Sequence, residues 1–340
     1  MIALALVGLG VWLVNDIGRA SEDASGGGTL GRPYSEDSAW NTPIDASPDI
    51  DPQSAELVAG ISTSTEDGVI TSDPTQYTYP VYVADANTPR YDVPCTWYKC
   101  TITQPGEEPL RVEILERVPI PADARPSAGS DGSMIVIDAD SGAEYDLWMA
   151  TREGNSWSVG NASVYNIAWD GMPNSYGSRG AGLPYLAGLV RHREIAAGVI
   201  EHAIAFASPN VSATGCVWPA SKTDGTSEEP DALPEGARLQ LDPSLTDEDF
   251  TAMGLDTVGR VIARALQEYG MILVDGSGRA KIMVEDLTAN SSGDASWSEP
   301  PTELSETTIS TIPVEAFRVL ALPDSYYSGA AGPRHGDCHR

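Results

Sequence analysis

The sequence predicts a mainly β fold, an antiparallel β-sandwich or jelly roll with a few peripheral helices. Short runs in which apolar and other residues alternate recur from residue 78 onward, and this period is typical of strands with one buried face. Gly, Pro, Asp and Asn separate the runs, as in turns between antiparallel strands. Apolar residues at helical spacing are fewer. We therefore expect a single β-rich domain over residues 33–325.

The individual strands are predicted from these runs. Residues 134–138 and 144–149 bracket the sequence DADSGA, which favours a hairpin between them. The complete set of predicted strands covers residues 79–84, 110–116, 134–138, 144–149, 163–169, 200–206, 237–242, 271–275, 281–285 and 317–322.

Helices are predicted in three places. Residues 256–269 give the clearest one, because their apolar side chains follow the three-four spacing of a single helix face. Asp256 is suited to the N-cap of this helix and Gly270 to its C-cap. Short helices are also expected within residues 51–60 and 183–197.

The net charge of the chain limits the classes of molecule that it is expected to bind. Asp and Glu total 49 among the 340 residues, against 20 Lys and Arg, which gives a formal net charge of -29. Such a surface repels phosphate backbones and anionic lipids, and no run of Lys or Arg offsets it. We therefore expect no nucleic-acid partner. Solubility or a saline habitat explains the acidity without a specific acidic function.

The first residues predict export. Residues 1–14 are almost purely apolar, which suits the core of a signal peptide better than a membrane span of about 20 residues. No basic residue precedes them and no clean cleavage site follows nearby, so residues 1–20 are interpreted as a signal peptide or a membrane anchor, with a short buried helix as the alternative. Residues 21–32 predict a flexible tether and residues 326–340 a mobile C-terminal tail. The protein is expected to be extracellular or at the cell surface.

Four cysteines agree with an oxidising compartment. Cys95 and Cys100 flank the short sequence TWYK, and we predict a disulfide between them, with two free thiols as the alternative. Zinc is disfavoured there because paired CxxC motifs and nearby histidines are missing. Cys216 and Cys338 could also pair, but the sequence alone does not show it.

Missing motifs argue against several kinds of chemistry. The chain has no GxSxG, no GxxxxGK[ST] and no HExxH sequence. Asp138, Asp140 and Glu144 could resemble a calcium loop, but the twelve-residue pattern is incomplete and an acidic hairpin turn looks the same. No cofactor is therefore expected, and calcium is only an alternative at this turn.

The run at residues 144–149 carries the first candidate site. Along a strand, Glu144, Asp146 and Trp148 share one face, while Tyr145 lies on the other. Two carboxylates beside a tryptophan suit a sugar-binding groove, where a sugar ring stacks on the indole and the carboxylates act as acid and base. A solvated strand face with one half-buried tryptophan is the alternative.

Histidine and arginine residues extend this candidate site. His202 lies between isoleucines in a strand-like run, so it is either a hydrogen-bonded core residue or a general base at the floor of a cleft. Arg179 and Arg191 belong to the most basic neighbourhood of the chain and could bind a carboxylated sugar. Trp40, in an irregular N-terminal segment, is a further candidate for sugar binding.

A resemblance supports export. The chain is similar over roughly residues 33–322 to an uncharacterised group of secreted bacterial proteins of the actinobacterial type. The runs that carry it are Trp40-Asn41, DGSMIVID, EYDLW, LAGLVR, VIEHAIAF, VWPAS, GARLQLDPS and ALQEYGMILVD. That group often has a histidine where this chain has Ser133, a departure that puts activity in doubt if the histidine is catalytic. In architecture alone, the sequence is also similar to β-sandwich polysaccharide lyases and glycoside hydrolases, an analogy that does not establish function.

The expected function is cleavage of an extracellular polysaccharide or cell-envelope glycan, by a hydrolase or a lyase. A non-catalytic glycan-binding module and a structural cell-surface module are the alternatives. The predicted catalytic residues are His202, Glu144, Tyr145 and Asp146, and the predicted substrate-binding residues are Trp148, Arg179, Arg191 and Trp40.

Overall fold

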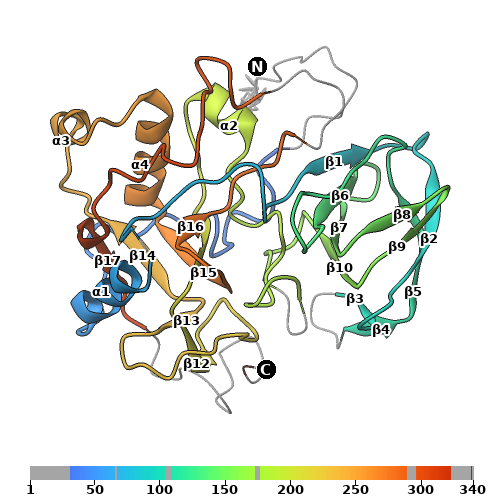
Figure 1. Cartoon of the computed structure of the whole chain (residues 1–340), viewed down its shortest axis with the longest axis horizontal. Coiled ribbons are helices and arrows are strands. Elements are labelled where there is room, and N and C mark those ends of the chain that lie inside the picture. Colours follow the sequence, from blue (N-terminus) through green and yellow to red (C-terminus); the bar gives the residue numbers. More distant parts are fainter. Residues whose placement is uncertain are drawn as a thin grey trace, which may run out of the picture.

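The protein is mainly β, with several mostly antiparallel sheets and few helices, so the predicted fold class is confirmed (Figure 1). The computed structural model describes residues 31–65, 67–103, 109–172, 177–288, 296–322 and 338. The predicted export segment lies outside these residues, as do most of the predicted tether and all of the predicted tail except Cys338. None of the helices in the described ranges is long and apolar enough to cross a membrane.

The first half of the chain forms a six-stranded sheet. Its hairpin is the predicted one: β6 and β7 pair antiparallel, with Ile137 opposite Glu144. Two short two-stranded sheets, β2 with β5 and β8 with β9, accompany it. The six strands, in spatial order, are β1 (Val81–Ala84), β6 (Met134–Asp138), β7 (Ala143–Trp148), β10 (Asn161–Asn166), β3 (Cys100–Ile102) and β4 (Leu110–Val112). The small sheets comprise β2 (Arg90–Pro94), β5 (Ile114–Pro119), β8 (Thr151–Glu153) and β9 (Ser156–Ser158).

The second half forms a five-stranded sheet with the helices around it. The strands, in spatial order, are β16 (Lys281–Ile282), β11 (Ile204–Ser208), β15 (Met271–Gly276), β14 (Arg238–Leu241) and β17 (Phe317–Val319). The helices are α1 (Ser54–Ser64), α2 (His192–Ala197), α3 (Asp247–Ala252), α4 (Thr257–Glu268) and the 3-10 helix η1 (Val314–Ala316). A separate parallel pair consists of β12 (Val211–Cys216) and β13 (Leu233–Glu235).

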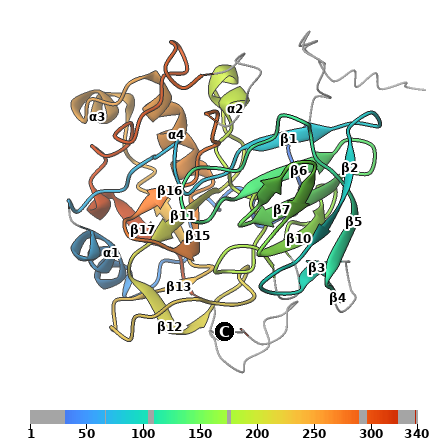
Figure 2. The ribbon, with the colours of Figure 1, turned by 45° about the vertical axis from the view of Figure 1, so that its right-hand side comes forward.

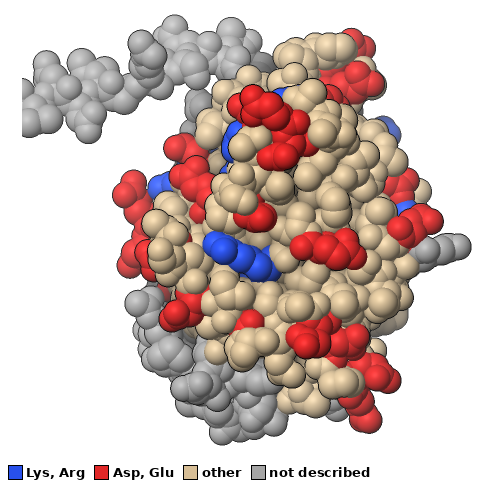
Figure 3. Space-filling view, turned by 90° about the vertical axis from the view of Figure 1, so that its left-hand side faces the viewer, with Lys and Arg blue, Asp and Glu red and all other residues tan. Residues whose placement is uncertain are grey.

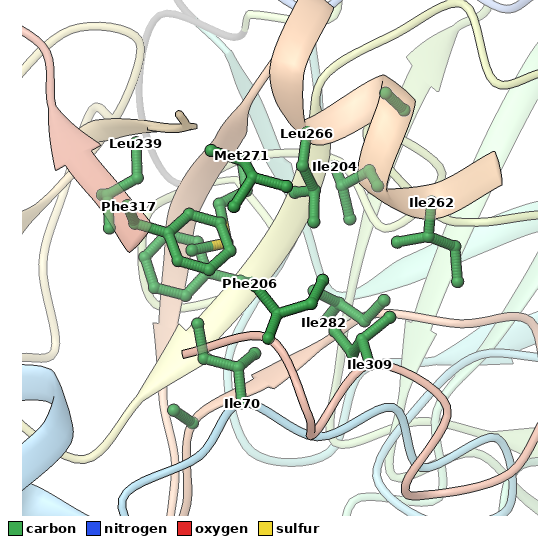
Figure 4. Close-up of a cluster of buried hydrophobic side chains, with 14 of the residues drawn as sticks. Ile70, Ile204, Phe206, Leu239, Ile262, Leu266, Met271, Ile282, Ile309 and Phe317 are labelled. Carbon is green, nitrogen blue, oxygen red and sulfur yellow. The ribbon is translucent and has the colours of Figure 1, made fainter. Parts of the chain in front are cut away.

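Helix α4 shows why this half is stable. The Asp256 side chain accepts a hydrogen bond from the Gly259 N–H at 2.7 Å, which confirms the predicted N-cap. Its apolar face, with Ile262 and Leu266, packs on the sheet beside Met271 (Figure 4). Each side chain of this size contributes roughly 1.5–3 kcal/mol when it is fully buried.

A shared core joins the two sheets. Ile137 of β6 and Ile272 of β15 belong to one buried cluster, together with Leu183 and Leu189 from the segment between the halves. Figures 1 and 2 show the first sheet on one side of the molecule, the second sheet and its helices on the other, and irregular chain between them. Any site at this seam is therefore built by both halves.

Two predicted strands differ most from the observed ones, whereas the prediction of one or two short helices within residues 183–197 is confirmed by α2. Residues 110–116 divide at Glu113, because β4 and β5 pair with different partners. Residues 200–203 do not join β11; the Ala203 N–H instead donates to the Trp40 carbonyl at 2.7 Å. Within residues 183–197 only α2 is helical, since the residues before it are buried between the two sheets.

Two disulfides constrain the fold. The predicted bond between Cys95 and Cys100 is confirmed, with a Cα–Cα distance of 5.8 Å. A second disulfide joins Cys216 to Cys338, 122 residues further along the chain. Cys338 is thus covalently bound to β12.

We expect the two disulfides to stabilise the fold unequally. Replacing Cys216 and Cys338 with serine should lower the free energy of unfolding by up to about 5 kcal/mol, because a very long loop is no longer closed in the unfolded chain. The same change at Cys95 and Cys100, which are separated by only 5 residues, should cost about 2 kcal/mol. Guanidinium unfolding followed by tryptophan fluorescence measures both, and equal losses would contradict the loop-length explanation.

Candidate functional site

A cavity of about 1190 Å³ opens at the seam between the two sheets. Strands β3 and β7 contribute to its lining from the first half, and β11, β15 and β16 from the second. Aromatic side chains are prominent in its wall: Tyr77, Tyr79, Tyr98, Trp148 and Tyr185. This volume exceeds the 300–1,000 Å³ or so of a typical small-molecule pocket.

Three carboxylates converge at this cavity. Oxygen atoms of Asp224, Glu235 and Asp275 all lie within 4.8 Å of one another. Asp275 follows the buried apolar run of β15, Glu235 ends β13, and Asp224 lies in the loop between β12 and β13. The backbone completes the cluster, because the Gly180 N–H donates to Asp275 Oδ1 at 3.2 Å.

Glycine is required at position 180 for the cluster to assemble. A Cβ atom there would lie 2.4 Å from Glu235 Oε1 and 2.5 Å from Asp224 Oδ1, well inside van der Waals contact. Glu235 is 0% exposed, so its carboxyl group has little freedom to move away. The close approach of backbone and carboxylates therefore depends on the missing side chain.

Burial changes the protonation of the cluster. Burial, reinforced by the charge of Asp224, raises the pKa of Asp275 to about 7. Burial also raises the pKa of Glu235 well above its usual value, and its Oε1 has no hydrogen-bond partner among the described residues. The cluster can therefore retain protonated carboxyl groups near neutral pH, which is the requirement for a general acid.

Lys222 provides positive charge beside the cluster. Burial lowers the pKa of its ammonium group, while the charges of Asp275, Glu235 and Asp224 oppose that shift. Three carboxylate oxygens so close together are a donor set for a hard cation such as Ca²⁺. Because Lys222 already supplies a compensating charge, the arrangement suits acid–base chemistry better than metal binding.

The predicted carboxylates of β7 lie behind another part of the cavity wall. Glu144 is buried and accepts hydrogen bonds from Tyr34 Oη at 2.6 Å and from the Leu186 N–H at 3.1 Å. Asp146, only 1% exposed, lines the cavity and accepts one from the Tyr185 N–H at 2.7 Å. Burial, followed by the charge of Glu144, raises the pKa of Asp146 well above its usual value.

Arg179 binds the same stretch of backbone as Asp146, but at its carbonyl groups. Its guanidinium donates to the Tyr185 carbonyl at 2.6 Å and to the Ala187 carbonyl at 2.8 Å. It also lies 5.2 Å from the ring of Tyr79, which stacks on Tyr185 with a centroid distance of 4.2 Å. The backbone φ of Arg179 is +54°, a conformation that is uncommon for a residue other than glycine.

A second, much smaller cavity of about 10 Å³ is bordered by three other predicted site residues, Trp40, Arg191 and His202. His202 is 5% exposed, with Nε2 3.1 Å from Glu194 Oε1 and Nδ1 2.9 Å from the Ala203 carbonyl. Arg191 Nε pairs with Glu285 Oε2 at 2.9 Å. Trp40 belongs to the core shared by the two sheets.

The structure thus separates the predicted site residues. Asp146, Trp148 and Arg179 meet at the large cavity, and Glu144 lies behind them. Tyr145 packs against the core of the first sheet, on the opposite face of β7. His202, Arg191 and Trp40 do not line the large cavity. Their catalytic and binding roles stay predictions.

The carboxylate cluster and Lys222 were not predicted from the sequence. Asp224 and Asp275 each precede a glycine, and an Asp-Gly pair is an ordinary turn signal. The informative signal was the position of Asp275 at the end of the apolar run MILVD, where an ionisable group leaves a buried strand. The alternative calcium turn has other partners: Asp138 pairs with Arg90 at 3.1 Å, while Glu144 bonds Tyr34.

We expect the ion pair of His202 and Glu194 to make stability depend on pH. Burial opposes the charge on His202, but Glu194 raises its pKa above the usual value of about 6.5, and His202 in turn lowers the pKa of Glu194. The stabilisation by His202 should therefore be complete below about pH 6.5 and decline as the pH rises through the higher pKa of the folded state.

The variant His202→Gln tests this expectation. Urea unfolding at pH 6 should show a loss of about 3 kcal/mol relative to the parent, and the difference should shrink toward pH 9. Glu194→Gln is the matched control, because it removes the same pair from the other side. Parallel pH curves for the parent and His202→Gln would show that the imidazole is not charged in the folded protein.

The chain matches no family model, no curated protein and no solved structure. Its function must therefore be inferred from the geometry of the cavity.

Proposed function

We propose that the protein cleaves a polysaccharide by hydrolysis, at the carboxylate cluster of the large cavity. One observation carries the proposal: Asp275, whose pKa is raised to about 7, lies beside the exposed side chain of Asp224 in a cavity lined by aromatic rings. A protonated carboxyl group and a carboxylate side by side are the two groups that glycoside hydrolysis requires.

The spacing of the two carboxyl groups favours a two-step reaction. One oxygen atom of each carboxyl group lies within 4.8 Å of one of the other, which is nearer to the ~5–5.5 Å between the carboxyl groups of retaining glycosidases than to the ~6.5–9.5 Å of inverting ones. In the first step Asp275 gives its proton to the glycosidic oxygen, while a carboxylate oxygen of Asp224 attacks the anomeric carbon and the glycosidic bond breaks. In the second step water, deprotonated by Asp275, releases the sugar from Asp224.

The neighbouring groups suit these roles. Burial and the charge of Asp224 favour the protonated form of Asp275. Glu235 tends to keep its own proton, because burial and the charges of Asp224 and Asp275 raise its pKa. Lys222 places an ammonium group within electrostatic reach of the same carboxyl groups and limits the repulsion among them. The pair can therefore hold one proton near neutral pH and still leave a charged oxygen for the attack.

The cavity wall fits a chain of sugars. Tyr77, Tyr98 and Trp148 offer amphipathic rings on which the apolar face of a sugar can stack. A volume of about 1190 Å³ leaves room for several sugar units. We include secretion in the proposal, since two disulfides are compatible with an oxidising compartment.

The charge of the cavity favours sugars that carry carboxylates. Among the described residues that line it, six are basic and six are acidic, whereas the whole sequence has 20 basic and 49 acidic residues. The surface elsewhere is far more acidic, as the many Asp and Glu side chains in Figure 3 illustrate. An anionic sugar repelled by the rest of the molecule would therefore be tolerated here. The basic residues are Lys99, Arg111, Arg179, Lys222, Arg279 and Lys281.

Hydrolysis is better supported than elimination. A lyase needs a base that removes a carbon-bound proton, commonly a histidine or tyrosine. None of the described residues that line the cavity is a histidine, and burial raises the pKa values of Tyr79 and Tyr185, which makes them harder to ionise. The other two tyrosines of the wall, Tyr77 and Tyr98, are 47% and 61% exposed, and neither belongs to the carboxylate cluster. The acid that hydrolysis needs is available, because Asp275 can hold a proton near neutral pH.

We expect the variants Asp275→Asn and Asp224→Asn each to lose at least 100-fold in the release of reducing ends from the polysaccharide that the parent cleaves. Because Asp275 must be protonated to act as the acid, the parent's activity should fall as the pH rises through about 7. Reducing-end assays on a panel of neutral and carboxylated polysaccharides provide the measurement.

The control is Glu248→Gln, which neutralises an exposed carboxylate on α3. It should retain the activity of the parent. Undiminished activity in both aspartate variants would refute the assignment of the cluster. Saturable binding of a polysaccharide without any product, even after long incubation, would favour a non-catalytic glycan-binding module instead.

A further inference from the structure

The loop closed by the Cys95–Cys100 disulfide presents two large aromatic side chains to solvent. Trp97 is 63% exposed and Tyr98 is 61% exposed. Large aromatic rings usually bury most of their surface, so two exposed neighbours in one short loop call for a binding partner.

The backbone of this loop is held firmly although its rings are exposed. The N–H groups of Trp97 and Tyr98 both donate to the Gly160 carbonyl at 3.0 Å, and the Thr96 N–H donates to the Val159 carbonyl at 2.8 Å. The disulfide closes the loop at its base. The rings are therefore presented by an ordered backbone, which reduces the entropy lost when a ligand binds.

The loop is continuous with the large cavity. Tyr98 and Lys99 line the cavity themselves. Trp97 packs edge-on against Trp148, with a centroid distance of 5.6 Å and an interplanar angle of 87°, and Trp148 also lines the cavity. An aromatic path thus runs from the cavity wall to the outer surface.

We propose that this loop is an outer sugar subsite, in which Trp97 and Tyr98 stack on pyranose rings of the same polysaccharide whose cleaved bond lies at Asp224 and Asp275. The inference rests on the proposed function and extends it from the cleaved bond to the rest of the chain. A polysaccharide is the occupant that fits best, because it is long enough to follow the aromatic path out of the cavity.

The groups around the rings also suit a sugar. Lys99 and Glu113 form an exposed ion pair at 3.0 Å beside the loop, and both can hydrogen-bond hydroxyl groups. Asn161 fixes the loop from the cavity side, since its Nδ2 donates to the Lys99 carbonyl at 2.8 Å. Aromatic faces flanked by polar groups match the alternation of apolar faces and hydroxyl edges on a pyranose.

The experiment uses the full chain in native affinity gels that contain sodium alginate, polygalacturonate, hyaluronan, xylan or glucomannan. We expect at least one polysaccharide to retard the parent. Trp97→Ala and Tyr98→Ala should each weaken that retardation about 3- to 10-fold, and the double variant should weaken it further. On the cleaved polymer Trp97→Ala should raise KM and leave kcat within about twofold, because Trp97 is not among the residues that line the cavity of the carboxylate cluster.

Two controls accompany these variants. Val199→Ala removes another exposed apolar side chain, next to α2 and outside the cavity lining, and should bind like the parent. The pair Cys95→Ser with Cys100→Ser keeps both rings but opens the loop, and should weaken retardation without abolishing it. Thermal unfolding of each variant identifies any loss of folding.

The outcomes separate the two proposals. Retardation of the double variant equal to that of the parent overturns the outer subsite and leaves the active site untouched. If the double variant is retarded less than the parent and the parent forms no product, the outer subsite is supported and cleavage is overturned. A parent that no polysaccharide retards, and that releases no product, overturns both.

Discussion

The whole architecture depends on how one irregular buried segment satisfies its backbone. Residues 177–190 contain no helix and only an isolated bridge, yet all of them are buried at the seam between the two sheets. Without regular structure, their N–H and C=O groups need partners from elsewhere. Glu144 and Asp146 accept from two of the N–H groups, and Arg179 donates to two of the carbonyls. Buried polar side chains, together with backbone groups such as the Val274 carbonyl that accepts from the Ala181 N–H, thus supply the partners that a sheet would otherwise provide.

This solution shapes the cavity as well as the core. Tyr185 and Tyr79 stack in the position that Asp146 and Arg179 fix, so the cavity wall is rigid where it is most aromatic. Burial that serves the fold also raises the pKa of the carboxyl groups involved, as it does for Asp146, so these groups tend to keep their protons. The cluster around Asp275 draws on the same property, since burial is the main cause of its raised pKa.

Much of the fold could be predicted from the sequence because its signals are local. The hairpin of β6 and β7, the cap of α4 at Asp256 and the disulfide of Cys95 with Cys100 each follow from residues within one short stretch. The irregular segment escaped prediction because its partners lie far along the chain. One or two short helices were expected within residues 183–197; α2 forms at the end of this range, and the residues before it, among them Leu183 and Leu189, are irregular and packed in the core shared by the two sheets.

The site was predictable only in part, for the same reason. Residue type and strand periodicity predicted three of the residues that line the large cavity, Asp146, Trp148 and Arg179. Asp224, Glu235 and Asp275 come from separate loops and strand ends, so their convergence is a property of topology. His202 shows the opposite case: its sequence context allowed a core role or a catalytic one, and its contacts to Glu194 and Ala203 lie away from the large cavity.

The disulfide between Cys216 and Cys338 has a consequence for how the carboxylate cluster responds to reduction. Cys216 lies opposite Glu235 in the pair of β12 and β13, so the disulfide holds Cys338 next to the strand that carries this buried carboxyl group. A reducing environment would open this bond and separate Cys338 from β12. The redox state of one bond, whose second cysteine lies 122 residues along the chain, is thereby linked to the surroundings of a buried carboxyl group.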